Sequence, residues 1–107
     1  MRVLLTNLPP LLRDILREAV AGESDMTVVG GAATDDLETL VRRSSPDIVI
    51  LQATPDAAQR VFETLGGIAV VAIDPQATHA VVLGADAPAA LNDVSPTTII
   101  MAIRRAG

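Results

Sequence analysis

The chain has no lysine, no cysteine and almost no aromatic residues, and each absence excludes a class of chemistry. Because all eight basic residues are arginines, Schiff-base catalysis and Walker-type phosphate loops, which need a lysine, are excluded. The lack of cysteine excludes a disulfide framework and a thiolate zinc site. Phe62 is the single aromatic residue, which argues against the stacking surfaces that bind single-stranded nucleic acid.

The net charge and the distribution of apolar residues argue against a nucleic-acid-binding protein and against a membrane protein. The chain has 107 residues and a formal net charge of −5, which disfavours binding to a phosphate backbone. This length supports one hydrophobic core, so we expect a single domain over residues 1–107. No apolar run approaches the length of a membrane span or of a signal-peptide core. We therefore expect a cytoplasmic protein that binds neither nucleic acid nor membranes.

Short apolar runs alternate with amphipathic stretches, a pattern that predicts strands alternating with helices. The expected strands cover residues 2–6, 26–30, 47–51 and 68–73. The expected helices begin at Pro9-Pro10, at a Thr34 cap followed by Asp35 and Asp36, at Pro55, and at Ser95-Pro96. The order predicts an α/β fold, a three-layer arrangement with an open sheet between helices.

Residues 74–91 depart from this alternation. The Ala80–Leu83 run is short, apolar and rich in β-branched residues, which favours a strand over a helix. We therefore expect that the fourth helix is lost or shortened. Residues 79–84 would then form a fifth strand, antiparallel to 68–73 at the sheet edge. In the alternative interpretation, residues 77–84 are a helical remnant and 88–92 form the fifth strand.

Three stretches of the chain resemble the receiver domains of bacterial response regulators. They are Met1-Arg2-Val3-Leu4-Leu5 through Asp14, Ser45-Pro46-Asp47-Ile48-Val49-Ile50-Leu51, and Asn92-Asp93-Val94-Ser95-Pro96 through Arg104. Together they make most of residues 1–65 and 92–105 similar to a receiver, whereas residues 74–91 do not match. The resemblance implies a flavodoxin-like, receiver-like sheet with strand order 2-1-3-4-5.

The positions that carry receiver chemistry hold other residues in this chain. A working receiver needs an acidic pair that binds magnesium, a phosphoacceptor aspartate, a hydroxyl-bearing switch residue and a lysine. The resemblance places these at Asn7 and Leu8, at Gln52, at about Ala72 or Ile73, and at Asn92. An amide is uncharged and a poor nucleophile, so this set holds no cation and accepts no phosphoryl group. The resemblance implies an atypical, phosphorylation-independent receiver that is not an enzyme and uses no metal or cofactor.

The function expected from these features is a non-catalytic protein-interaction module in signalling, which binds itself as a homodimer or binds another protein. An unprotected apolar strand edge and a final helix that is apolar over a wide arc favour association. The interface candidates are Val82, Ile99, Ile100 and Ile103.

An alternative function is a small-molecule sensor. Ligands of open α/β sheets bind at the carboxyl ends of the strands, where the vestigial phosphorylation pocket of Asn7, Leu8, Gln52 and Asn92 would lie. Thr54 would add a further polar group to this edge. Asp56 and Asp74 are candidates for a cation site near it.

Overall fold

The structure is a computed structural model that describes residues 1–29, 36–84 and 88–106. In these residues the chain forms one mixed sheet of six strands with four helices. The strands are β1 (Arg2–Leu5), β2 (Thr27–Val29), β3 (Ile48–Gln52), β4 (Ala69–Ile73), β5 (Ala80–Leu83) and β6 (Ala89–Leu91). The helices are α1 (Pro10–Ala21), α2 (Leu37–Ser44), α3 (Pro55–Thr64) and α4 (Pro96–Ala106). The α/β class predicted from the sequence is confirmed.

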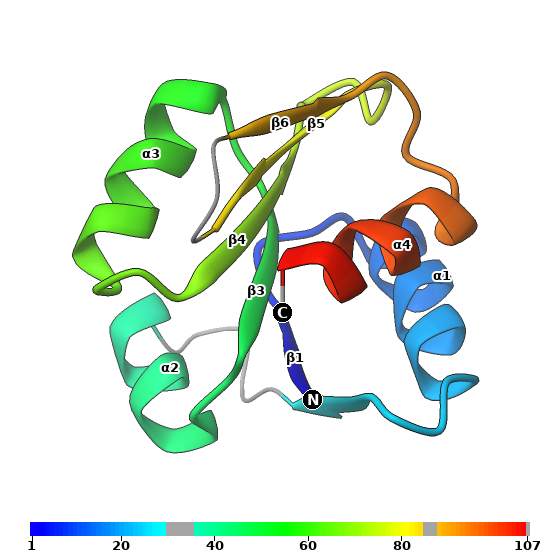
Figure 1. Cartoon of the computed structure of the whole chain (residues 1–107), viewed down its shortest axis with the longest axis horizontal. Coiled ribbons are helices and arrows are strands. Elements are labelled where there is room, and N and C mark those ends of the chain that lie inside the picture. Colours follow the sequence, from blue (N-terminus) through cyan, green and yellow to red (C-terminus); the bar gives the residue numbers. More distant parts are fainter. Residues whose placement is uncertain (30–35, 85–87, 107) are drawn as a thin grey trace.

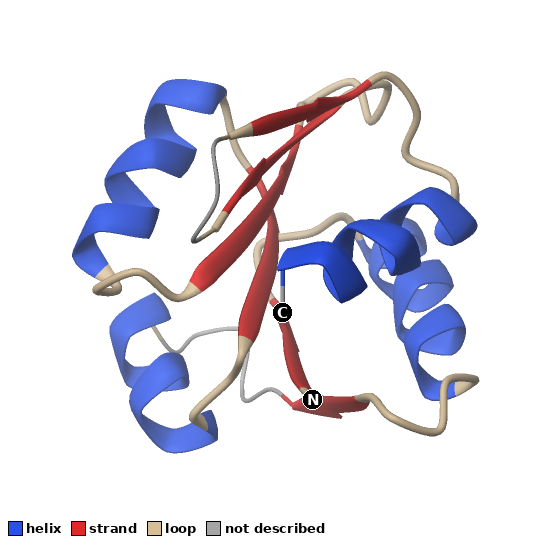
Figure 2. Ribbon diagram, in the orientation of Figure 1, coloured by secondary structure: helices blue, strands red, loops and turns tan. Residues whose placement is uncertain are grey.

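Helices cover both faces of the sheet and produce two separate cores (Figures 1 and 2). On one face, Leu16 of α1 and Ile99 of α4 pack with Val3 of β1. On the other face, Leu40 of α2 packs in a core with Leu4 of β1. Successive residues of a strand point to opposite faces, so β1 contributes to both cores and consists almost entirely of apolar residues.

The strand order in the sheet is β2-β1-β3-β4-β5-β6. Strands β2, β1, β3 and β4 are parallel to one another, and β5 then runs antiparallel to β4. Val70 pairs with Leu83 and Ile73 pairs with Ala80. The predicted antiparallel pairing of residues 79–84 with 68–73 is therefore confirmed, and a turn rather than a helix connects β4 to β5.

The position of β5 at the sheet edge, however, was predicted wrongly. Strand β6 pairs antiparallel with β5, with Ala80 opposite Leu91 and Val82 opposite Ala89. Without β6, the N–H and C=O groups on the outer side of β5 would have no strand to pair with. Hydrogen bonds to β6 satisfy them. Each interpretation was thus partly right, since residues 80–83 are a strand and residues 89–91 are a strand as well.

Side-chain caps define where the helices begin. Asp36 caps α2, because its carboxylate accepts a hydrogen bond of 2.7 Å from the backbone N–H of Thr39. The sequence had assigned this cap to Thr34, which lies outside the described residues, and had placed Asp36 in the first turn. The hydroxyl groups of Thr54 and Ser95 cap α3 and α4, each before a proline that suits the first helical turn.

Candidate functional site

In the predicted vestigial phosphorylation pocket, the side-chain amides of Asn7 and Gln52 form hydrogen bonds within the chain. Gln52 ends β3, and its Nε2 donates to the carbonyl oxygens of Asp74 at 3.3 Å and Pro75 at 3.1 Å. The Nδ2 of Asn7 donates to the carbonyl oxygen of Gln52 at 3.0 Å. Asn7 has a φ of 51°, a left-handed conformation that asparagine adopts more readily than most residues. The amide groups of both side chains therefore hold loops together at the carboxyl edge of the sheet.

The four pocket residues predicted from the sequence do not form one site. Leu8 packs against the core beneath α1 and α4. Asn92 follows β6, which is separated from β3 by β4 and β5. Because neighbouring strands lie about 4.8 Å apart, β6 lies about 14 Å from β3 across the sheet. Asn92 is therefore not beside Gln52, and among the four residues only Asn7 and Gln52 are joined by a hydrogen bond given by the structure.

Asp74 organises the turn between β4 and β5. Its Oδ1 accepts hydrogen bonds from the backbone N–H groups of Thr78 at 2.7 Å and His79 at 3.1 Å, and its Oδ2 accepts one from the Thr78 hydroxyl at 3.0 Å. The His79 and Thr78 contacts hold the pKa of Asp74 below its ordinary value. Asp56 lies in the first turn of α3. Within the described ranges, no three side chains of metal-binding type are grouped to hold a cation.

Three of the four predicted interface residues are buried within the chain. Val82 is 8% exposed, and Ile99 and Ile103 are completely buried in the core beneath α1 and α4. Their burial corrects the prediction, because β6 covers β5 and the apolar face of α4 packs on the sheet. Ile100 is half-buried, and the exposed apolar residue of this helix is its neighbour Met101.

A broad cavity of about 620 Å³ lies along β2, at the edge of the sheet opposite β6. Its volume falls within the range of about 300–1,000 Å³ that is typical of ligand sites. The residues that line it are mostly basic or aliphatic: Arg2, Leu5, Arg13, Arg17, Val28, Val29, Arg43 and Ser44. We call this feature the arginine groove. Sequence reasoning did not identify it.

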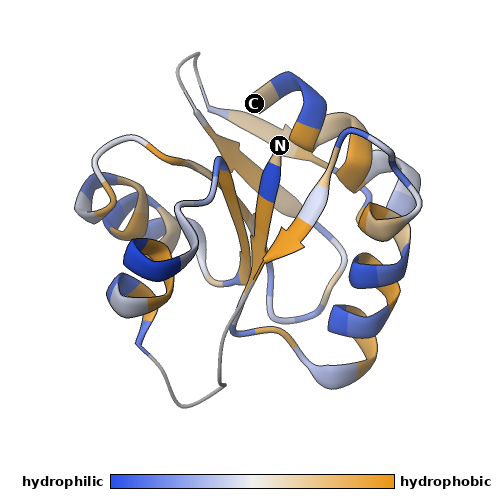
Figure 3. Ribbon diagram, turned by 90° about the horizontal axis from the view of Figure 1, so that it is seen from below, coloured by the Kyte–Doolittle hydropathy of each residue, from blue (hydrophilic) through white to orange (hydrophobic). Residues whose placement is uncertain are grey.

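Both helical layers contribute to the arginine groove. Arg13 and Arg17 come from α1, and Arg43 comes from α2 on the opposite face of the sheet. Val28 packs on one core and Val29 on the other, so the groove extends round the edge of β2. In Figure 3, which is seen from the β2 side, the hydrophobic end of this strand lies between helices on both sides.

The arginines of the groove differ in their interactions with other groups of the chain. The Nε of Arg2 donates to the carbonyl oxygen of Ser44 at 2.6 Å, which holds its guanidinium at the C-terminal end of α2. Arg43 is already engaged with another group of the chain. Arg13 and Arg17 are exposed and lie one turn apart on α1, and neither forms an ion pair with a carboxylate in the part of the chain that the structure describes.

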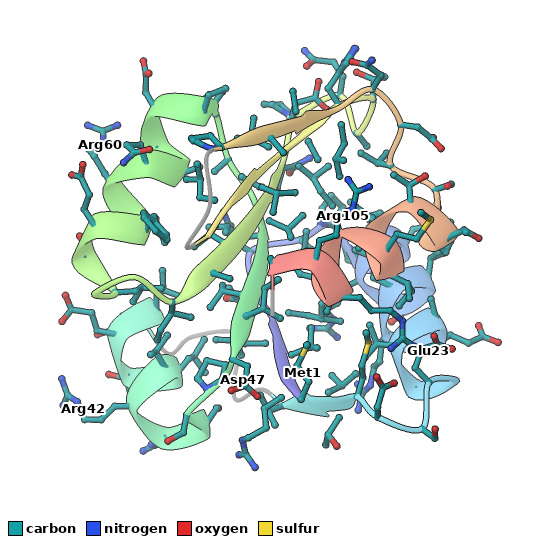
Figure 4. All side chains as sticks on the ribbon, in the orientation of Figure 1. Met1, Glu23, Arg42, Asp47, Arg60 and Arg105 are labelled. Carbon is teal, nitrogen blue, oxygen red and sulfur yellow. The ribbon has the colours of Figure 1, made fainter. Side chains whose placement is uncertain are left out.

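A separate charged cluster fixes the end of α4. The guanidinium of Arg104 contacts Asp25 and lies 2.5 Å from Glu23. Both carboxylates lie in the connection between α1 and β2. Hydrogen bonding to Asp25, and then to Glu23, raises the pKa of Arg104, and the contact with Arg104 lowers the pKa of Asp25. This cluster joins distant segments, whereas Arg42 and Arg60 project outward from α2 and α3 (Figure 4).

No known protein family, curated protein or solved structure matches this chain. The resemblance to receivers therefore stays a prediction that rests on the three sequence stretches. No helix among the described residues has the length and apolar character that crossing a membrane requires.

Proposed function

We propose that the chain is a non-catalytic protein-interaction module with a receiver-like fold, which associates with itself or another protein and is not switched by phosphorylation. The hydrogen bonds of Gln52 carry this proposal. They fasten the end of β3 to the loop that begins at Asp74. A receiver needs a free carboxylate at this position and a mobile region beside it, so an amide that ties the loop down favours a module with one fixed state.

The arrangement of the sheet supports the receiver-like part of the proposal. Strands β2, β1, β3, β4 and β5 are adjacent in that order, which is the order of a flavodoxin-like sheet. Here β5 runs antiparallel to β4 and is followed by β6. We interpret the molecule as a flavodoxin-like sheet whose last crossover helix has been replaced by a turn and whose edge has gained one strand.

Exposed aliphatic side chains support association. Leu11 is 74% exposed and Ile15 is 41% exposed, and they lie one turn apart on α1. Met101, on the neighbouring helix α4, is 55% exposed. Burying such side chains between two molecules removes apolar surface from water. This surface takes the place of the interface predicted from Val82, Ile99 and Ile103.

Light scattering over a concentration series tests the proposal when it is repeated after incubation with acetyl phosphate and Mg²⁺. We expect a concentration-dependent dimer, the same mass with and without the phosphodonor, and no phosphoryl adduct in the intact-mass spectrum. Leu11→Glu should shift the equilibrium toward monomer, and Arg60→Glu should leave it unchanged. A phosphoryl adduct together with a change in association would refute the proposal. A monomer at every concentration would refute self-association and restrict the proposal to a different protein as partner.

A further inference from the structure

We propose that the arginine groove binds an extended peptide segment of a partner protein, and that the segment carries carboxylate side chains. This inference rests on the proposed function as an interaction module and specifies the chemistry of the partner.

The distribution of charge selects an acidic ligand. The chain has a net charge of −5 and eight arginines, of which Arg2, Arg13, Arg17 and Arg43 line the groove. The groove is thus a basic site on an acidic protein. Arginine presents a planar fork of donors that fits a carboxylate bidentately. A long polyanion such as nucleic acid would extend beyond the groove along a protein of net negative charge, whereas a short acidic segment can keep its carboxylates beside the arginines, where the attraction is least screened.

Arg13 and Arg17 are the groove residues most ready to receive a ligand. Like charges at i and i+4 on a helix repel each other, and the described carboxylates do not neutralise this pair. Arg104 provides the contrast within the same chain, because its guanidinium is paired with Asp25 and Glu23. A carboxylate in the groove would relieve the repulsion between Arg13 and Arg17, and both side chains could bind it without breaking an ion pair described in the structure.

The edge of β2 favours an extended peptide over a compact anion. The N–H of Thr27 donates to the carbonyl oxygen of Met1 at 2.7 Å, so the peptide groups of Thr27 face β1. Because these groups alternate along a strand, the N–H and C=O of Val28 point away from β1. An added strand can pair with them. Successive side chains of the added strand would point to opposite faces, those on one face toward Arg13 and Arg17 and those on the other toward Arg2.

Fluorescence anisotropy with a labelled seven-residue peptide of alternating Glu and Val tests this assignment. We expect binding that weakens as salt is added. The double variant Arg13→Gln/Arg17→Gln should bind about tenfold more weakly or worse, the effect of losing charge-assisted hydrogen bonds. The matched control Arg60→Gln/Arg105→Gln removes the same charge from other exposed helix positions and should bind as the wild type does. Equal melting temperatures would confirm that both variants are folded.

Hydrogen exchange locates the peptide on the protein. We expect the Val28 amide to exchange more slowly when the peptide is bound. A peptide of the same charge with proline at alternate positions should give no such protection, because it cannot pair as a strand. Failure of the Glu-Val peptide to bind, or equal loss of binding in both double variants, would overturn the assignment. Tighter binding of inorganic phosphate or of single-stranded DNA than of the peptide would overturn the proposed class of ligand.

The two proposals fail in different measurements. If the peptide does not bind but the chain still associates independently of the phosphodonor, the inference about the groove is wrong and the interaction module stands. If the phosphodonor forms an adduct and changes the association, the interaction module as proposed is wrong whatever the peptide does.

Discussion

The side-chain amide of Gln52 donates a hydrogen bond of 3.1 Å to the carbonyl oxygen of Pro75, which lies 23 residues further along the chain. The backbone supports this link, because the N–H of Ala53 donates to the carbonyl oxygen of Ile73 at 2.9 Å. The end of β3 and the loop after β4 are therefore held together by both main-chain and side-chain bonds.

Removing the Gln52 amide should loosen this connection. We expect Gln52→Ala to lower the free energy of unfolding by about 1 kcal/mol, the value typical of a lost internal hydrogen bond. Gln52→Glu should cost about 2 kcal/mol, because it loses both donors and places a carboxylate against two carbonyl oxygens. Urea denaturation at pH 7 measures both values. Gln59→Ala is the matched control, since the Gln59 amide donates to the exposed Glu63 carboxylate on the surface of α3, and an equal loss there would contradict the role of Gln52.

Two apolar residues of α4 differ in burial, so shortening their side chains should have different effects on stability. Ile103 is completely buried and Met101 is 55% exposed. We expect Ile103→Ala to lower the free energy of unfolding by about 2–5 kcal/mol through lost burial and a new cavity. Met101→Ala should change it by less than about 0.5 kcal/mol. Denaturation of both variants checks this at a protein concentration where the chain is monomeric. A loss of stability below about 1 kcal/mol for Ile103→Ala would contradict its place in the core and make it an interface candidate again.

Acid should weaken the fold through its hydrogen-bonded aspartates. The His79 and Thr78 contacts lower the pKa of Asp74, and the Ser95 and Thr98 side chains lower that of Asp93, each from an ordinary value of 3.8. A carboxylate with a lowered pKa in the folded state stabilises the fold above its unfolded pKa, and this stability is lost as pH falls through the folded pKa. The melting temperature should therefore decrease as the pH is lowered below about 4.

Asp74→Asn should reduce this dependence on acid. An asparagine amide has no negative charge for acid to neutralise. The variant should therefore be less stable than the wild type at neutral pH, and it should lose less stability between about pH 4 and pH 2. Melting curves at a series of pH values check the difference. Asp14→Asn, on the exposed side of α1, should keep the wild-type profile. Identical profiles for Asp74→Asn and the wild type would contradict the link between the turn and acid stability.

The end of α2 offers a stabilising substitution. Ser45 caps this helix with φ 47° and ψ 56°, a left-handed conformation that glycine adopts without a Cβ clash. We expect Ser45→Gly to raise the free energy of unfolding by up to about 1 kcal/mol. Ser24 has no positive φ, so Ser24→Gly should bring no gain, because glycine only increases the freedom of the unfolded chain. Chemical denaturation of both variants compares them directly.

The parts of the fold that sequence alone predicted are those set by local patterns. Pro10, Pro55 and Pro96 each open a helix where predicted, because proline fits the first helical turn and little else in a helix. The apolar runs gave the central strands for a similar reason, since a strand covered on both faces has no polar side. Strand β6 was missed in the main prediction because Ala89 and Ala90 have low strand propensity, and pairing with β5 decides its conformation.

The candidate site depends on contacts that no local pattern contains. Arg2, Arg13, Arg17 and Arg43 come from three different elements, and only the folded sheet edge gathers them. The one local signal was the spacing of Arg13 and Arg17, which places two like charges on the same side of a helix. The predicted pocket took Asn92 from the resemblance to receivers, whereas in the fold β4 and β5 separate β3 from β6, the strand that precedes Asn92.

The short turn between β4 and β5 also affects how quickly different parts of the sheet can form. Strands β4, β5 and β6 pair with their neighbours along the chain, whereas β1 pairs with β3 across the whole of α1, β2 and α2. Closing a short loop costs less entropy than closing a long one, and local contacts speed folding. We expect the β4–β5–β6 meander to be formed in the transition state. Substitutions there should slow folding, and equally destabilising ones in β1 should mainly speed unfolding.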